Sequence, residues 1–116
     1  MEIINLMPGE QKTIYRGAKV SVEDLNLIFK IVGLSVFSRQ VDYNFTIIFS
    51  GHPRNIIVRM PFTLYAPHYY GNWGYNPLDF DRFVGDKGPY TSIAILSNEN
   101  NQRPLKIQFN VSVGVH

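Results

Sequence analysis

The sequence predicts an all-β fold, namely an antiparallel β-sandwich of the jelly-roll or immunoglobulin-like type, with seven or eight strands and one long aromatic loop. Apolar and polar residues alternate along several segments, which is the period of a strand with one buried face. Glycine, proline and asparagine separate these segments at short intervals. The chain has 116 residues, of which 45% are hydrophobic. This length fits a single domain, residues 1–116, with one core.

The N-terminal region contains three short segments with strand character. They are "EIINL" (2–6), "QKTIY" (11–15) and "KVSV" (19–22). Pro8 and Gly9 separate the first two segments, and Gly17 separates the second from the third. Because proline and glycine favour turns, we expect three separate strands here.

Residues 23–38 have two interpretations. A helix from Val22 to Val32 would have Ser21 as its N-cap and two acidic residues in its first turn. A strand would place alternate apolar residues on one face, and these are Leu25, Leu27, Phe29 and Ile31. We favour the strand because β-branched and aromatic residues are frequent in this segment.

Residues 41–65 have the pattern of a β-hairpin. Alternate positions of the first half are apolar: Tyr43, Phe45, Ile47 and Phe49. Gly51 and Pro53 mark a turn, and alternation resumes in "NIIVRMPFTLY". Since Pro61 has no N–H to donate to a sheet, the second strand is predicted to be an edge strand or to bulge there.

The C-terminal region is also predicted to form a hairpin. "YTSIAILS" (90–97) is followed by the polar turn "NENNQRP" and then by a strongly alternating segment. The apolar face of that last segment consists of Leu105, Ile107, Phe109, Val111, Val113 and Val115. One apolar and one polar face are typical of an antiparallel strand lying against a core.

Residues 66–88 break the alternation and are predicted to be an irregular loop. The segment contains several glycines and prolines and is rich in aromatic residues, including the single tryptophan, Trp73. A connection this long is usually functional or disordered, and disordered segments are poor in aromatics. We therefore expect the loop to fold onto a surface.

Two interpretations of this loop stay open. It can close one end of the sandwich as a lid, with Phe80 and Phe83 as anchors. Alternatively, it presents rings and amides to a ligand, which is a carbohydrate or a protein surface. The ligand-binding residues would be Tyr69, Tyr70, Asn72, Trp73, Tyr75 and Asn76.

The predicted function is accordingly a non-enzymatic binding module. The alternative is a structural or assembly subunit that forms homo-oligomers through strand edges or sheet faces.

Three carboxylates at the end of the loop suggest a weak calcium site. Asp79, Asp81 and Asp86 lie close together in the sequence, but their spacing is not that of an EF-hand. Arg82 and Lys87 would equally well pair with them as ordinary surface charges. No other cofactor is predicted.

Several classes of function find no support in the composition. The chain has no cysteine, which excludes thiolate metal sites and disulfides. No nucleophile, zinc or nucleotide motif is present, so an enzyme is not predicted. The net charge is +2 and the basic residues are scattered, which makes nucleic-acid binding an unfavoured expectation. No signal peptide or membrane span is apparent, and the localisation stays unknown.

Overall fold

The computed structural model describes residues 2–34, 42–51, 57–65, 71–75, 85–101 and 104–113. Strands dominate these residues and form two antiparallel sheets, so the predicted all-β class is confirmed. The strands are β1 (Glu2–Leu6), β2 (Gln11–Val20), β3 (Leu25–Leu34), β4 (Asp42–Ser50), β5 (Val58–Tyr65), β6 (Gly71–Tyr75), β7 (Tyr90–Ser97) and β8 (Leu105–Val113).

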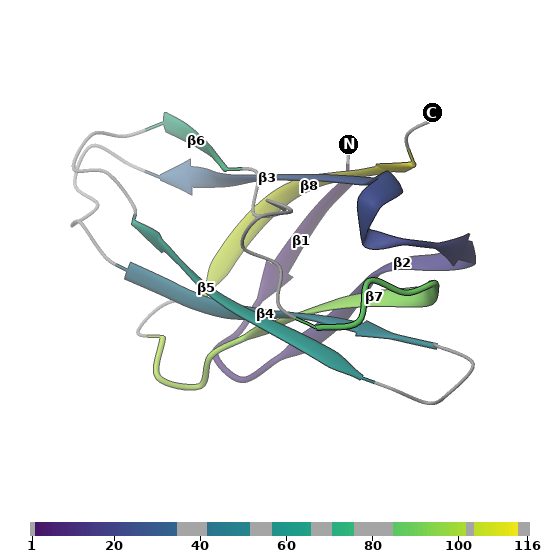
Figure 1. The fold of residues 1–116 in the computed structure, drawn as a ribbon. Coiled ribbons are helices and arrows are strands. Elements are labelled where there is room, and N and C mark those ends of the chain that lie inside the picture. The colour runs from purple at the N-terminus through teal and green to yellow at the C-terminus, as the bar shows by residue number, and fades with distance from the viewer. Residues whose placement is uncertain are drawn as a thin grey trace.

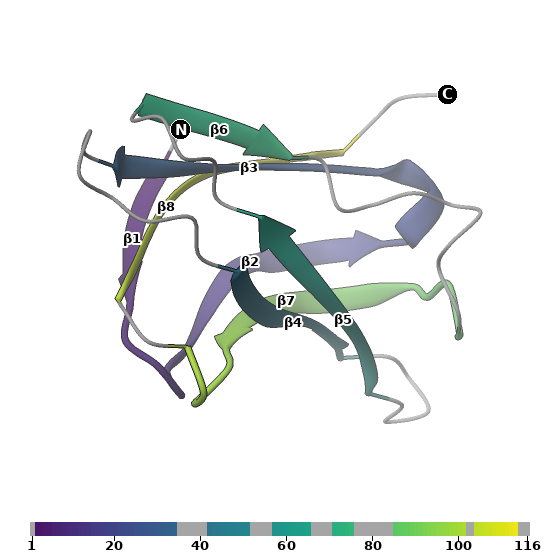
Figure 2. The same cartoon turned by 90° about the vertical axis from the view of Figure 1, so that its left-hand side faces the viewer.

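Each sheet has four strands and they lie one over the other, as Figure 1 shows. The first sheet has the order β1-β8-β3-β6 and the second has the order β2-β7-β4-β5. The chain changes sheet at every connection between consecutive strands except the one between β4 and β5. Figure 2 gives the view along the layers, with β6 and β1 at opposite edges of the upper sheet.

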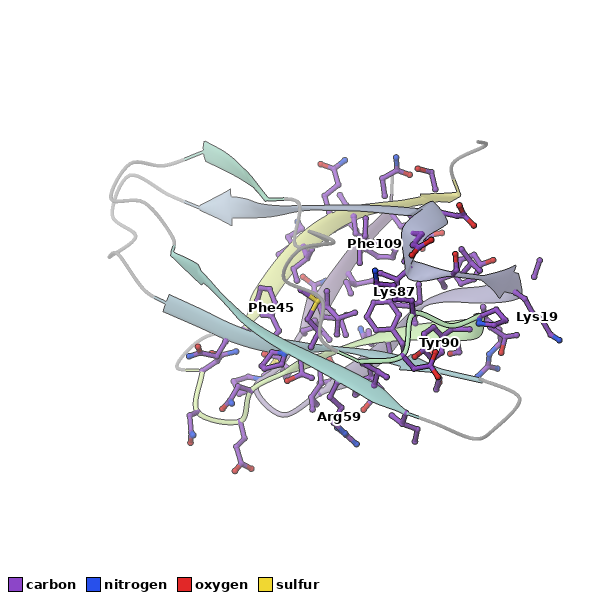
Figure 3. The ribbon with its side chains drawn as sticks, in the orientation of Figure 1. Lys19, Phe45, Arg59, Lys87, Tyr90 and Phe109 are labelled. Carbon is purple, nitrogen blue, oxygen red and sulfur yellow. The ribbon has the colours of Figure 1, made fainter. Side chains whose placement is uncertain are left out.

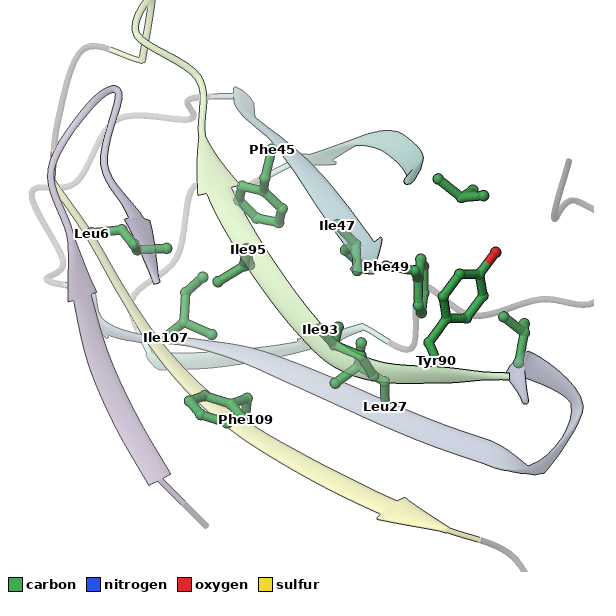
Figure 4. Packing of buried hydrophobic residues seen from close by; sticks show 12 residues of the cluster. Leu6, Leu27, Phe45, Ile47, Phe49, Tyr90, Ile93, Ile95, Ile107 and Phe109 are labelled. Atoms are coloured by element: carbon green, nitrogen blue, oxygen red, sulfur yellow. The ribbon is translucent and has the colours of Figure 1, made fainter. Parts of the chain in front are cut away.

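The core lies between the two sheets and receives side chains from both (Figure 4). Its buried members include Leu6, Leu27, Phe45, Ile47, Phe49, Tyr90, Ile93, Ile95, Ile107 and Phe109. The rings of Phe49 and Tyr90 contact each other with centroids 5.6 Å apart. Burial of each large apolar side chain contributes about 1.5–3 kcal/mol to folding, so the alternation seen in the sequence is what holds the sheets together.

The predicted break at Gly17 is wrong, because residues 11–20 form the single strand β2. The strand accommodates its extra residues through two irregularities in its pairing with β7, one between Thr13 and Tyr15 and one between Arg16 and Val20. The Tyr15 hydroxyl donates a hydrogen bond of 2.7 Å to the carbonyl oxygen of Ala18 and so bridges the second bulge. A glycine in a strand often marks such a bulge rather than a turn.

The preference for a strand over a helix in residues 23–38 is confirmed for β3. The helix-start signal is nevertheless real over one turn. Val22–Asp24 form a 3-10 turn, and the Ser21 hydroxyl donates to a carboxylate oxygen of Asp24 at 3.0 Å. The β-branched and aromatic residues that follow favour an extended chain over a helix.

The hairpin predicted for residues 41–65 is confirmed, since β4 and β5 pair antiparallel. β5 is an edge strand, as Pro61 predicts, and Pro61 pairs with Thr46. Arg59 on β5 points away from the core, as does Lys19 on β2 (Figure 3).

The hairpin predicted for the C-terminal region is wrong. β7 pairs with β2 and β4, whereas β8 pairs with β1 and β3 in the other sheet. The intervening turn is a corner between sheets. Asn101 fixes that corner, since its side chain is 6% exposed and bonds to the backbone of Asn44. A polar turn specifies a reversal of direction, but it does not specify which sheet receives the next strand.

Candidate functional site

The predicted aromatic loop contains a strand. Residues 71–75 form β6, which pairs with β3, so the expectation of an irregular segment is wrong for this stretch. Among the described residues β6 is an edge strand of its sheet, and it carries three of the predicted ligand-binding residues, namely Asn72, Trp73 and Tyr75. The alternation is hidden in the sequence because glycine occupies the first and fourth of its positions.

The register of β6 puts its aromatic residues in cross-strand rows with core residues of β8. Trp73 pairs with Ile31, which pairs in turn with Ile107. Tyr75 likewise belongs to the cross-strand row of Phe109. The pairing of β3 with β6 is irregular between Ile31 and Leu34, and Asn72 is the β6 residue that lies opposite this irregularity.

The remaining predicted site residues lie outside the described residues. These are Tyr69, Tyr70 and Asn76 of the ligand site and Asp79 and Asp81 of the calcium site. Among the residues that the structure describes, no cluster of three metal-binding side chains occurs. Calcium binding therefore stays a prediction.

Asp86, the third predicted calcium ligand, organises the end of the aromatic segment. Its carboxylate accepts a hydrogen bond of 3.0 Å from the backbone N–H of Gly88, and its carbonyl oxygen accepts one from the Tyr90 hydroxyl. The neighbouring Lys87 carbonyl oxygen accepts a hydrogen bond from Val22 at 2.8 Å. Residues 85–90 are therefore anchored against the turn that precedes β3, and Figure 3 shows Lys87 and Tyr90 beside each other there.

A pocket of about 410 Å³ lies at the other edge of the same sheet, and sequence reasoning missed it. It opens between β1 and β8 on one side and β2 on the other. Its lining residues are Glu2, Ile14, Tyr15, Arg16, Phe109, Asn110 and Val111. Ligand pockets in proteins have volumes of about 300–1,000 Å³, so this one has the size of a binding site.

The pocket has an apolar floor and a fixed wall. Phe109 is 4% exposed, and Val111, Ile14 and Tyr15 are half-buried. The hydrogen bond from Tyr15 to Ala18 holds the tyrosine ring across the β2 bulge. Glu2 is exposed and pairs with Phe109, which places it at the mouth. The one signal in the sequence was Gly17, which marks the bulge that shapes this wall.

No known family or curated protein matches the chain. Its function therefore has to be argued from the geometry of its own residues. Within the described residues there is no helix with the length and hydropathy required to cross a membrane.

Proposed function

We propose that this chain is a non-enzymatic binding module whose recognition surface is segment 66–88. One observation carries the proposal: the aromatic strand β6 is an edge strand. An edge strand keeps a row of main-chain groups that no neighbouring strand pairs, and these suit recognition of an extended partner or of hydroxyl groups. The hydrogen bonds around Asp86 hold the far end of the segment on the scaffold.

We further infer that residues 1–116 form one domain and that its two sheets make a sandwich of the jelly-roll type. The strand orders β1-β8-β3-β6 and β2-β7-β4-β5 support this, because they give each sheet the interleaved connections of two Greek keys. Lectin and viral capsid domains both use jelly rolls. The fold alone therefore fits recognition and assembly equally, and the choice depends on the site.

The residue types of the segment favour a carbohydrate or a protein surface as ligand. Tyrosine and tryptophan supply large contact areas and lose little rotamer entropy on binding, while asparagine supplies adaptable hydrogen bonds. Tyr69, Tyr70, Trp73 and Tyr75 alternate with Asn72 and Asn76 in this way. Aromatic rings of this kind dominate the binding energy of interfaces when they are central to them.

The test compares the wild type with Trp73→Ala on a glycan array and in a pull-down. The matched control is Ile57→Ala, which removes an apolar side chain that is 57% exposed and lies just before β5 of the other sheet. We expect a ligand whose binding falls at least about tenfold with Trp73→Ala, as for an interface hot spot, and is unchanged with Ile57→Ala.

Fluorescence of the single tryptophan distinguishes recognition from a lid. If segment 66–88 binds a ligand, iodide should quench the Trp73 emission in the folded protein, and the emission should shift when the ligand is added. A blue-shifted emission that iodide does not quench, with no ligand lost on Trp73→Ala, would overturn the proposal. Segment 66–88 would then be a cover for the core.

The second candidate function is that of an assembly subunit. The observation that favours it is the exposure of large apolar side chains on the described surface, with Ile3 at 53%, Met7 at 55% and Ile57 at 57%. Ile3 and Met7 belong to or follow the edge strand β1. Size-exclusion chromatography with light scattering tests it, because a strict monomer at high concentration excludes homo-oligomer formation.

A further inference from the structure

The pocket lies where one strand of its sheet ends before its neighbour. β1 pairs with β8 from Leu6↔Leu105 to Glu2↔Phe109. Beyond that point, β8 continues to Val113 and pairs with β3 on its other side. In the described residues no strand therefore pairs with residues 110–113 of β8 on the side that faces the pocket.

The direction of the main chain in β1 shows which groups of β8 face this open side. Lys12 Nζ donates a hydrogen bond of 2.8 Å to the carbonyl oxygen of Asn5, so Asn5 directs its main-chain groups away from β8. Asn5 pairs with Lys106, and main-chain direction alternates along a strand. The odd-numbered residues of β8 accordingly direct their N–H and C=O toward the β1 side. Val111, which lines the pocket, offers one donor and one acceptor there.

The wall opposite β8 is shaped to accept a side chain. The first irregularity of β2, between Thr13 and Tyr15, turns Ile14 as well as Tyr15 toward the pocket, and the Tyr15 hydroxyl bond to Ala18 holds that wall in place. Phe109 and Val111 form the floor. An apolar side chain entering here would exchange water for contacts with four apolar residues.

Two charged residues line the pocket, the acidic Glu2 and the basic Arg16. Glu2 pairs with the buried Phe109 and therefore lies on the inward face of its sheet. Arg16 pairs with Ser92, next to the fully buried Ile93, so its register position is on the outward face of the other sheet. A basic group arriving at the mouth would meet the Glu2 carboxylate.

We propose that this pocket is a second recognition site, which binds an extended peptide segment of a partner protein. The segment adds as a short strand beside residues 110–113 of β8. It bonds to the main chain of Val111 and places one aliphatic side chain between Phe109 and Ile14. A lysine or arginine two residues away in the segment lies on the same face and faces Glu2. Main-chain bonds supply affinity and the pocket supplies specificity, as in other cases of strand addition.

The main-chain groups of Val111 favour a peptide over a small apolar molecule. A small molecule would fill the pocket and leave a strand edge unpaired, whereas a peptide satisfies both. β1 itself limits the slot at its other end, because Glu2 already pairs with Phe109 there. The slot therefore fits a segment of a few residues.

The experiment titrates the ¹⁵N-labelled chain with three capped pentapeptides and follows amide signals by NMR. The first has the sequence Lys-Thr-Leu-Thr-Lys, and the second replaces the central leucine with aspartate. A third peptide is methylated at the central nitrogen, which removes a main-chain donor without altering the protein. We expect the leucine peptide to shift the amide signals of Val111 and Tyr15. The aspartate and methylated peptides should bind at least about tenfold more weakly, the loss of one main interaction.

Two protein variants complete the test. Ile14→Trp fills the pocket and should weaken binding at least about tenfold, whereas Ile57→Trp places the same residue at an exposed position away from it and should not. Trp73→Ala should leave peptide binding unchanged, so failure of the aromatic surface and failure of this site are separable. Equal binding of the leucine and aspartate peptides, or no shift at Val111 up to about 2 mM, in the range of very weak binding, would overturn the proposal. If Ile14→Trp does not fold, the methylated peptide still decides.

Discussion

Removal of the Asn101 side chain tests how the two sheets are joined at the corner between β7 and β8. Asn101 Oδ1 accepts a hydrogen bond of 2.9 Å from the backbone N–H of Asn44. Its Nδ2 donates to the carbonyl oxygen of Asn44 at 2.9 Å and to Ser97 Oγ at 2.8 Å. The amide thereby pairs with Asn44 as a neighbouring strand would, across 57 residues of sequence.

The magnitude follows from these three bonds. Each contributes about 0.5–1.5 kcal/mol net, and more is lost where a buried partner keeps an unmet donor. The carbonyl oxygen of Asn44 also accepts from the backbone N–H of Asn98 at 2.9 Å, so it is still bonded in the variant. We therefore expect Asn101→Ala to lower the free energy of unfolding by about 2–3 kcal/mol. For a domain of this size, that corresponds to a fall in Tm of about 6–15 °C.

The measurement is urea unfolding of Asn101→Ala beside the wild type, followed by circular dichroism. Asn100→Ala is the matched control, because Asn100 is exposed in the same turn and its replacement should change stability by less than about 0.5 kcal/mol. Similar losses for both variants would show that the turn as a whole matters and that the Asn101 amide does not. A loss below about 0.5 kcal/mol for Asn101→Ala would refute the reasoning outright.

The isosteric variant Asn101→Asp adds a dependence on pH. A carboxylate at this position would be buried and would face the Asn44 carbonyl oxygen, which can only accept, so folding should raise the pKa of the new group. The contribution of a group with a raised pKa is fully present below its unfolded pKa of about 3.9 and is lost as pH rises through the folded pKa. Asn101→Asp should therefore be less destabilised, relative to the wild type, near pH 4 than at pH 7. An equal deficit at both values would contradict this.

The remaining predictions concern a tight turn and a strand edge. Gly51→Ala should lower the free energy of unfolding by about 2–4 kcal/mol, because Gly51 has φ +83° and an added Cβ would overlap Thr91 Oγ1. Gly17→Ala should cost less than about 1 kcal/mol, since its Cβ would lie in ordinary contact 3.5 Å from Tyr15, and chemical unfolding of both variants checks the contrast. Lys12→Val uncovers a carbonyl oxygen on the β1 edge and should promote self-association in light scattering, whereas Lys106→Val, on an inner strand, should not.

Much of the fold could be predicted because its signals are local. Alternation along a strand reports which residues face the core, and Phe45, Ile47, Phe49, Ile107 and Phe109 are all buried as expected. The edge position of β5 could be predicted from the missing N–H of Pro61, which depends only on that residue.

The predictions fail where the same local sequence pattern is compatible with more than one tertiary arrangement. A polar turn reverses the chain whether the next strand joins the same sheet or the opposite one, so the placement of β8 depends on Asn101 reaching Asn44. Gly17 is compatible with a turn and with a bulge. The structure has the bulge, because the Tyr15 hydroxyl donates a hydrogen bond across it to Ala18. Gly71 and Gly74 hide the strand β6 in the same manner. The pocket brings residues 14–16 and 109–111 together, and no pattern in the sequence indicates that these two segments lie close in space.

In both candidate sites the open main-chain edge belongs to the same sheet, and the edges explain why. Each sheet has two edge strands, and edges must be protected or used. In the second sheet, Pro61 interrupts β5 and two bulges interrupt β2, so these edges are poor templates for a partner. In the first sheet, Lys12 covers β1 only at Asn5 and leaves the adjoining part of β8 open, while β6 carries aromatic residues at the opposite edge. We expect strand edges to be protected mainly on one sheet if the other sheet performs the recognition. The independent variants Trp73→Ala and Ile14→Trp test the two edges of that other sheet separately.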